Sequence, residues 1–477
     1  MRTRRQILAS LAACAATPRR LGAQRLPSIA LLNRLSEALS RIEVVNTHEH
    51  IIPEQERVAQ PVDFFTLASH YAIGDVISAG LEPEALAKVN DRALPPQERW
   101  RTFEPYWNRA RFTGYGQALR IAIRDIYGFE ITGVALPAIN EAIHAQNKPG
   151  LYRRILKEKA RIRVSVLDDY WNATPVKPDP EFFVLAHKFD RFVIPASRKD
   201  VGQLAKIAGV SIASMADLKR AMETSFQQFL SIGMAAVKST IAYNRELLFH
   251  EVPAAAAEAD FTALMRGERP LPERLRRNVD RPFRNLEDHM FHHLIRLADS
   301  HRLPIQIHTG LHAGNGNFIA NSKPTHLTNL FFLYPKVHFD LFHISYPYQG
   351  ELSTLAKLFP NVHVDFCWAH IISPRVSRGA LHEFLETVPY NKIFGFGGDY
   401  RYPELSYAHC VIARRNIAQV LAEKTAEGFC SEQEALDIGR ALLHDNPARL
   451  FLRAQQRSST LAPATAPCIM EPCPSGD

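Results

Sequence analysis

Two histidines, His48 and His50, end an apolar segment that predicts a β-strand over residues 43–50. Successive side chains of a strand point to opposite faces, so residues that are separated by one project in the same direction. Neutral imidazole is the most common side-chain ligand of metal ions. The pair is therefore a candidate two-pronged metal site, although two polar residues at the end of a strand would show the same spacing.

Further residues that can bind a metal or carry a proton follow later apolar segments. Lys238, His308, His343 and Asp399 each stand at the end of a predicted strand. In a closed barrel of parallel strands, the side chains at the C-terminal ends of the strands meet at one face. One such histidine is usually a core residue, but four histidines and an aspartate at four strand ends are hard to explain by packing. The set therefore predicts a metal centre.

The elements that would carry these residues alternate between strands and helices. Alternation of this kind favours a parallel sheet, and about eight strands in about 400 residues favour a (β/α)8 TIM barrel over an open sheet. Helices are predicted at 214–231 and 284–301. After residues 43–50, strands are predicted at 162–167, 192–195, 235–238, 303–308, 337–343, 362–365 and 393–396.

The chain divides into a barrel and three further segments. We assign the barrel to residues 24–455, and within it the aromatic-rich residues 51–150 predict a helical insertion after the first strand, placed to cover the site and exclude water. Residues 1–23 combine arginines with a short apolar stretch, which predicts a twin-arginine signal peptide and export to the periplasm. Residues 456–477 are rich in Pro, Ser, Thr and Ala and predict a disordered tail.

The composition is that of a soluble globular protein, with 46% hydrophobic and 22% charged residues. The net charge of +8 falls to +3 without the five arginines of residues 1–23, and no dense basic cluster follows, so we expect no nucleic-acid partner. The apolar stretch before Cys14 is too short to span a membrane, but a lipid anchor on Cys14 is an alternative to soluble export. Cys367 and Cys410 lie in apolar surroundings and are expected to be buried thiols. The expected partners are a small-molecule substrate and further copies of the chain in a homo-oligomer.

The order of the candidate ligands resembles that of a known superfamily. H-x-H, Lys, His, His and Asp on successive barrel strands is similar to the amidohydrolase superfamily, and residues 445–451 resemble a helix start of amidohydrolase-related (family 2) proteins. Further segments are similar to the amidohydrolase domain that some organisms fuse to a glutamine-synthetase-like domain. They are residues 111–115, Lys238–Ser239, Tyr243, 308–310, 343–347 and 399–404.

The resemblance implies a divalent metal centre of one or two ions, with zinc as the expected metal and manganese or iron as alternatives. His48, His50 and Asp399 would bind the first ion. His308 and His343 would bind a second ion, or one of them would donate a hydrogen bond to substrate.

Lys238 has two interpretations. The resemblance implies that Lys238 is carboxylated and bridges two ions, because an unmodified ammonium has no lone pair with which to bind a metal. The alternative is a lysine that binds an acidic substrate or pairs with a carboxylate.

The implied reaction is hydrolysis of an amide C–N or ester bond by a metal-activated water, since a bound cation lowers the pKa of water from ~15.7 towards ~7. Asp399 would take the proton and deliver it to the leaving group, with His343 as the second catalytic residue. The same site could instead serve a decarboxylase or a sugar-acid isomerase, and an exported binding protein without catalysis is the alternative of another class.

Three residues just beyond the strand ends are candidates for substrate binding: Tyr243, Arg245 and Arg401. Arginine binds carboxylates through a two-pronged fork. We therefore expect a small substrate that is acidic or derived from an amino acid, although each arginine could form a surface salt bridge instead.

Overall fold

The computed structural model describes residues 26–268 and 281–452. The predicted signal peptide (1–23) with Cys14 and the predicted tail (456–477) lie outside these residues. In the part of the chain that is described, no helix is long and apolar enough to cross a membrane.

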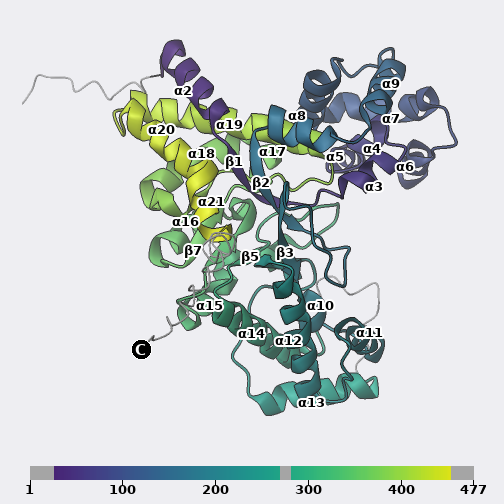
Figure 1. The fold of residues 1–477 in the computed structure, drawn as a ribbon, viewed down its shortest axis with the longest axis vertical. Helices are drawn as coiled ribbons and strands as arrows, with labels where there is room; N and C mark the ends of the chain where they lie inside the picture. Colours follow the sequence, from purple (N-terminus) through teal and green to yellow (C-terminus); the bar gives the residue numbers. More distant parts are fainter. Residues whose placement is uncertain (1–25, 269–280, 453–477) are drawn as a thin grey trace, which may run out of the picture.

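Eight parallel strands form one sheet in which each strand pairs with the next along the chain (Figure 1). Nearly every residue of these strands is buried, as expected when helices cover a parallel sheet. The arrangement confirms the predicted (β/α)8 TIM barrel. The strands are β1 (Val44–Glu49), β2 (Ile162–Asp168), β3 (Phe183–Lys188), β4 (Met234–Ser239), β5 (Ile305–Ile307), β6 (Phe339–Leu341), β7 (Val362–Asp365) and β8 (Ile393–Phe394).

The segment that follows β8 lies along β1 and completes the barrel. The Thr47 N–H donates to the Phe396 carbonyl at 3.1 Å, and the Asp399 N–H donates to the His48 carbonyl at 3.0 Å. These bonds bring the end of the last strand, and with it Asp399, beside the histidines of the first strand.

Helices surround the barrel, and residues at its C-terminal helix close the barrel at the N-terminal end of the strands. The predicted helices at 214–231 and 284–301 are confirmed as α12 (Met215–Ser231) and α14 (Arg284–His301). At the N-terminal end of the strands, the ring of Phe451 packs against that of Phe394. The other helices of the outer layer are α2 (Ile29–Arg41), α11 (Arg198–Ala208), α13 (Ala254–Arg266), α16 (Gln349–Leu358), α18 (Pro374–Thr387), α19 (Pro403–Ala426), α20 (Glu432–Arg440) and α21 (Asn446–Phe451).

The residues that connect β1 to β2 in the sequence form a lobe of short helices to one side of the barrel (Figure 1). Its core is aromatic: Phe64 packs edge-on against Trp100 and Phe103, and Phe103 stacks on Trp107. The predicted helical insertion after the first strand is thus present. Its α-helices are α3 (Glu54–Ala59), α4 (Phe64–Ala68), α5 (Ala72–Ser78), α6 (Pro83–Asn90), α7 (Pro96–Ala110), α8 (Gly114–Ala122) and α9 (Leu136–Gln146).

One predicted strand is wrong. Residues 192–195 form no strand; the helical turn α10 (Asp190–Val193) occupies part of this segment, and the third strand is β3, which ends at Lys188. Both segments are short apolar runs, and periodicity alone does not separate a buried strand from a buried helical turn. The Asp190 carboxylate accepts a hydrogen bond from the Thr240 N–H after β4, which anchors this helical turn to the end of the neighbouring strand.

Candidate metal centre

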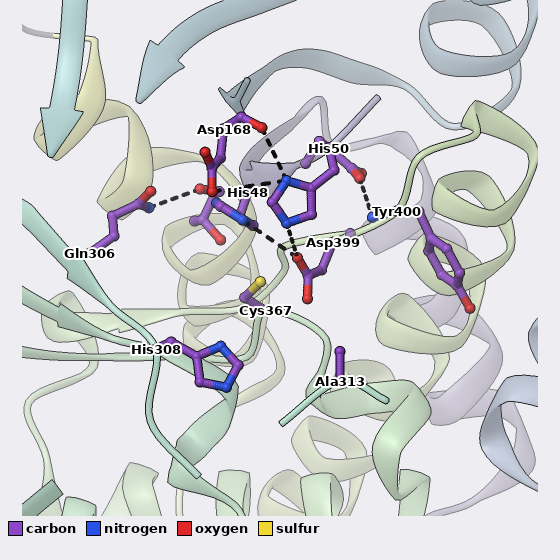
Figure 2. Close-up of polar contacts among 12 residues, drawn as sticks. His48, His50, Asp168, Gln306, His308, Ala313, Cys367, Asp399 and Tyr400 are labelled. Carbon is purple, nitrogen blue, oxygen red and sulfur yellow. Dashed lines mark hydrogen bonds and ion pairs between the residues drawn. The ribbon is translucent and has the colours of Figure 1, made fainter. Parts of the chain in front are cut away.

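His48, His50 and Asp399 meet at the C-terminal end of the barrel (Figure 2). Nε2 of His48 lies 3.4 Å, and Nε2 of His50 3.2 Å, from Oδ1 of Asp399. The two imidazole rings stand edge to face, with centroids 4.7 Å apart. Their ligand atoms are close enough together to hold one ion. This cluster thus contains three of the six residues predicted to bind metal.

The nitrogens of these histidines are oriented as metal ligands require. Nδ1 of His50 lies 3.0 Å from the Asp168 carbonyl, which can only accept, so in the neutral ring this nitrogen carries the proton and Nε2 offers its lone pair to the centre. In the described part of the chain, neither ring nitrogen of His48 has a hydrogen-bond partner, although the ring is fully buried. Burial lowers the pKa of His48 well below its usual value, which favours the neutral form that binds metal. These buried lone pairs fit a divalent cation.

His308 and His343, which follow the neighbouring strands β5 and β6, form a second pair. Nε2 of His343 lies 3.0 Å from Nδ1 of His308, and the outer nitrogens lie against the carbonyls of Leu311 (2.8 Å) and Cys367 (2.9 Å). The carbonyls hold the single proton of each neutral ring on its outer nitrogen, so the facing nitrogens both present lone pairs. Burial lowers the pKa of His343 to about 3. A cation between the rings therefore fits this pair better than an extra proton does.

Lys238 is buried beside these histidines without an acidic hydrogen-bond partner among the described residues. Its Nζ lies 3.3 Å from the centroid of the Phe342 ring, and burial lowers its pKa. The Phe342 ring also packs edge-on against His48, which places the lysine next to the first cluster.

Asp399 has a partner that the sequence did not indicate. The Tyr71 hydroxyl, from the insertion, donates to Oδ2 of Asp399 at 2.6 Å. The Tyr71 ring stacks on Trp368 at 4.7 Å and on Tyr115 at 5.2 Å. The insertion therefore builds part of the site wall. The sequence showed that the insertion is rich in aromatic residues, which predicted that it covers the site, but nothing in the sequence indicated which aromatic residue contacts Asp399.

Several residues around the centre have a left-handed backbone conformation. Tyr71, His343, Trp368 and Asp399 all have φ between 60° and 65°, which side chains other than glycine rarely adopt. Strained residues of this kind cluster at functional sites, where the surrounding fold holds them.

A glycine makes room for the approach of Asp399 to β1. A Cβ on Gly398 would lie 1.8 Å from Oε1 of Glu49, which is the residue between the two histidines. Glu49 in turn accepts the Tyr400 N–H at 2.8 Å, so β1 holds the residues on both sides of Asp399.

Of the three predicted substrate-binding residues, Tyr243 lies close to the candidate ligands, Arg401 is half-buried, and Arg245 is buried in an ion pair. The Tyr243 ring lies 4.7 Å from that of His308, at the edge of the centre, and its hydroxyl accepts the Ala313 N–H at 2.8 Å. Arg401 is half-buried, and in the residues described it has no acidic partner. Tyr243 thus lies beside the candidate ligands, and substrate binding by Tyr243 and Arg401 stays a prediction.

Arg245 lies in the scaffold instead. Its guanidinium is buried between Glu287 (3.1 Å) and Asp288 (2.7 Å) of α14 and also donates to the Leu248 carbonyl at 2.6 Å. With its donors used in this way, Arg245 has no free fork for a substrate carboxylate. We therefore correct its assignment to a structural ion pair.

Cys367 is buried, as expected, but it lies closer to the centre than its sequence context indicated. Its sulfur stands within 4.8 Å of ligand atoms of His343 and Asp399. Burial raises the pKa of the thiol well above its usual value. Cys367 therefore lies next to the candidate ligands, with its sulfur close enough to reach an ion held by His343 and Asp399.

Comparison with known families supports the resemblance that the sequence predicted. The sequence model of the amidohydrolase family matches residues 247–453. This part of the chain is similar to the amidohydrolase family. It includes His308, His343 and Asp399, and the resemblance that the sequence predicted is confirmed.

The individual proteins to which this chain is similar align over different shares of its length. Protein fluG of Emericella nidulans is 33% identical over 164 residues, which cover 33% of this chain and only 18% of fluG. Uronate isomerase of Corynebacterium efficiens is 23% identical over 467 residues and covers 88% of this chain and 95% of its own. The crystal structure of uronate isomerase from Thermotoga maritima has a TM-score of 0.74 at 17% identity, covering 90% of this chain and 99% of that one. At this identity, the structural likeness shows a shared fold.

Proposed function

We propose that this protein is a metal-dependent hydrolase that cleaves an amide C–N or ester bond of a small, acid-bearing substrate. The observation that carries the proposal is the grouping of four imidazoles, three of them buried and that of His50 partly buried, with the Asp399 carboxylate at the barrel rim. His48, His50 and Asp399 would hold a first ion, and His308 and His343 a second. Zinc suits this nitrogen and oxygen set.

A bound divalent cation would polarise the substrate carbonyl and make water a nucleophile at neutral pH. Asp399 is placed to move the proton, because one of its oxygens faces the histidines and the other accepts the Tyr71 hydroxyl. Ionised Asp399 can take a proton from water and give it to the departing nitrogen or oxygen. The Tyr71 hydrogen bond fixes the carboxylate in this orientation.

Lys238 would take part in one of two forms. Its lowered pKa favours the neutral amine. A neutral amine can react with carbon dioxide to form a carbamate with release of a proton, and a carbamate oxygen could bridge two ions. In the alternative form, the ammonium contacts the substrate directly.

Arg401 is our candidate for recognition of the acidic group, because its guanidinium faces no carboxylate of the described chain. A carboxylate is the group that an arginine fork binds best.

A sugar-acid isomerase is the second candidate, because the uronate isomerase of Corynebacterium efficiens aligns over 88% of this chain. Isomerisation moves protons between carbons and leaves the mass of the substrate unchanged. Hydrolysis adds one water. The two candidates therefore differ in a property that mass spectrometry measures directly.

The test combines metal analysis with product analysis. Purified protein and a His48→Ala, His50→Ala variant are analysed for zinc, manganese and iron, with His382→Ala, a half-buried histidine paired with Glu423, as the control. We expect bound metal in the wild type and the control and its loss in the double variant. Acid-bearing amides, esters and lactones are then incubated in H₂¹⁸O. One ¹⁸O atom in the acid product supports hydrolysis, whereas a product of unchanged mass, carbon dioxide release or no turnover of any compound contradicts it.

A further inference from the structure

Cys367 is a thiol at the rim of the barrel, two positions beyond the end of β7. Its side chain is fully buried, and its sulfur points toward Asp399 (Figure 2). This sulfur forms no hydrogen bond within the part of the chain that is described, whereas the buried thiol of Cys410 donates to the Ala160 carbonyl at 4.0 Å. Cys367 therefore presents an unused donor atom inside the site.

The sulfur belongs to a compact group of three potential ligand atoms. A nitrogen of His343, a carboxylate oxygen of Asp399 and the sulfur of Cys367 all lie within 4.8 Å of one another, and all three residues are buried. The Cys367 carbonyl can only accept, so the neutral His343 ring carries its proton on Nδ1, 2.9 Å away, and Nε2 offers a lone pair. Zinc binds histidine nitrogen, carboxylate oxygen and cysteine sulfur, so these three donors suit one ion.

The backbone holds Cys367 against the segment that carries Asp399. The Cys367 N–H donates to Oδ1 of Asp365 at 2.7 Å, and the Trp368 N–H donates to the Gly397 carbonyl at 2.9 Å. Gly397 lies so close that an added Cβ would stand 2.7 Å from the Cβ of Cys367. The segments after β7 and β8 are therefore fastened together next to the group, which keeps the sulfur near the carboxylate.

Burial raises the pKa of the free Cys367 thiol, but a bound cation acts in the opposite direction. The charge of the ion stabilises the thiolate, and a thiol that coordinates a metal loses its proton outright. As the bond between metal and sulfur forms, the proton passes to solvent, so the step needs no oxidant or reductant. Thiolate is a soft ligand, which favours zinc over manganese.

We propose that Cys367 is a sulfur ligand of the second ion, which it binds together with His343 and Asp399. The inference rests on the two-ion centre of the proposed function and adds a sulfur atom to the ligands of that ion. Asp399 belongs both to this group and to the group of His48 and His50, so its carboxylate would contact both ions. The sulfur would make the second position selective for zinc over manganese.

The test uses Co²⁺ as a spectroscopic probe. The full chain is freed of metal and titrated with Co²⁺ while absorption in the near ultraviolet is recorded. A bond between cobalt and thiolate sulfur gives an intense charge-transfer band there, whereas bonds to nitrogen and oxygen do not. We expect the band in the wild type and its loss in Cys367→Ser, which replaces the sulfur with oxygen. Cys410→Ser, at a buried thiol outside both ligand groups, is the matched control and should keep the band.

Metal selectivity gives a second readout, measured by competition with a chromophoric chelator. Even partners of metal ligands change metal affinity by roughly 10- to 100-fold, so loss of the sulfur should weaken binding of one Zn²⁺ or Cd²⁺ ion by about 100-fold or more. Mn²⁺, which prefers oxygen ligands, should lose much less. If Cys367→Ser folds poorly, X-ray absorption of the zinc-loaded wild type still decides, because sulfur stands at ~2.3 Å from zinc and nitrogen or oxygen at ~2.0–2.2 Å.

A wild type that shows neither the cobalt–sulfur band nor the sulfur shell overturns the proposal, as does a band that survives in Cys367→Ser. These measurements need no turnover. Sulfur ligation without hydrolysis would therefore contradict only the proposed function, and hydrolysis without sulfur ligation only this inference.

Discussion

The Tyr71 hydroxyl donates a 2.6 Å hydrogen bond to Oδ2 of Asp399, although the two residues lie 328 positions apart. Tyr71 belongs to the insertion, and Asp399 follows the last strand of the barrel. Both have a left-handed backbone, with φ of 65° and 62°. The insertion is therefore a structural part of the proposed active site.

Loss of the Tyr71 hydroxyl should slow catalysis without removing metal. Burial raises the pKa of Tyr71 well above its usual value, so the hydroxyl stays protonated and donates. A hydrogen bond to a charged group contributes ~1.5–3 kcal/mol, so Tyr71→Phe should lower kcat by roughly 10- to 100-fold. Tyr115→Phe, which changes a ring that stacks on Tyr71 and Trp368, is the control for packing. An unchanged kcat in Tyr71→Phe would show that the bond has no catalytic role.

Arg401 should matter only for substrates that carry an acidic group. Arg401→Gln removes the charged fork, and we expect kcat/KM for an acid-bearing substrate to fall roughly 10- to 100-fold, since a charged hydrogen bond contributes ~1.5–3 kcal/mol. The neutral methyl ester of the same substrate should lose little. Arg415→Gln, at an exposed position of α19, should affect neither compound. An equal loss for the acid and its ester would argue that Arg401 supports the fold.

Gly398→Ala should disturb the metal centre through Asp399. The new Cβ would lie 1.8 Å from Oε1 of Glu49, a buried carboxylate that Tyr400 and Asn46 hold by hydrogen bonds, so Glu49 or the segment after β8 must shift. Overpacking of this kind typically costs ~1–3 kcal/mol of stability. We expect a lower midpoint of thermal unfolding and weaker metal binding in a titration with Zn²⁺. The control is Gly350→Ala on α16, where no atom stands within 4 Å of the added group. Full metal affinity in Gly398→Ala would mean that the loop adapts without moving Asp399.

Two acids below the centre should make stability depend on pH. Burial raises the pKa of Asp365 to about 7, and burial together with the nearby Asp365 raises that of Asp340 well above its usual value. Gln306 donates to Asp340 at 3.0 Å. At these two acids the folded protein binds more protons than the unfolded chain between about pH 4 and pH 7, so their contribution to the free energy of unfolding should fall as the pH rises through this window. Buried histidines such as His343, whose pKa is lowered to about 3, contribute with the opposite sign, so the effect of the acids is measured as a difference between a variant and the wild type.

Denaturant unfolding at a series of pH values measures this slope. In Asp365→Asn the contribution of one acid is gone, so the free energy of unfolding of the variant relative to that of the wild type should rise from pH 4 to pH 7, whereas the exposed Asp437→Asn should show no such pH-dependent difference. A difference in unfolding free energy between Asp365→Asn and the wild type that stays constant or falls between pH 4 and pH 7 would contradict the prediction, provided that metal-free protein is used throughout.

Much of the barrel and of the candidate ligand set could be predicted from local sequence. Strands that are buried on both faces are apolar runs, and a polar residue at the end of such a run stands out, as His308 and Asp399 do. Residues 192–195 show where this reasoning fails, because a short buried helical turn has the same composition as a short buried strand. Asp190 and Thr240 hold that turn in place through a contact between distant segments.

The sequence by itself determined the fold class and which side chains could bind a metal, because both depend on the order of residues along single strands. Only the tertiary structure decided which of these side chains lie close together and which other residues contact them. Asp399 reaches His48 because the segment after β8 bonds to β1, and Tyr71 reaches Asp399 because the insertion folds over the rim. Arg245 is held within the scaffold by two acids of α14. Contacts of this kind join residues that are far apart in the chain, so the local pattern of residue types does not predict them.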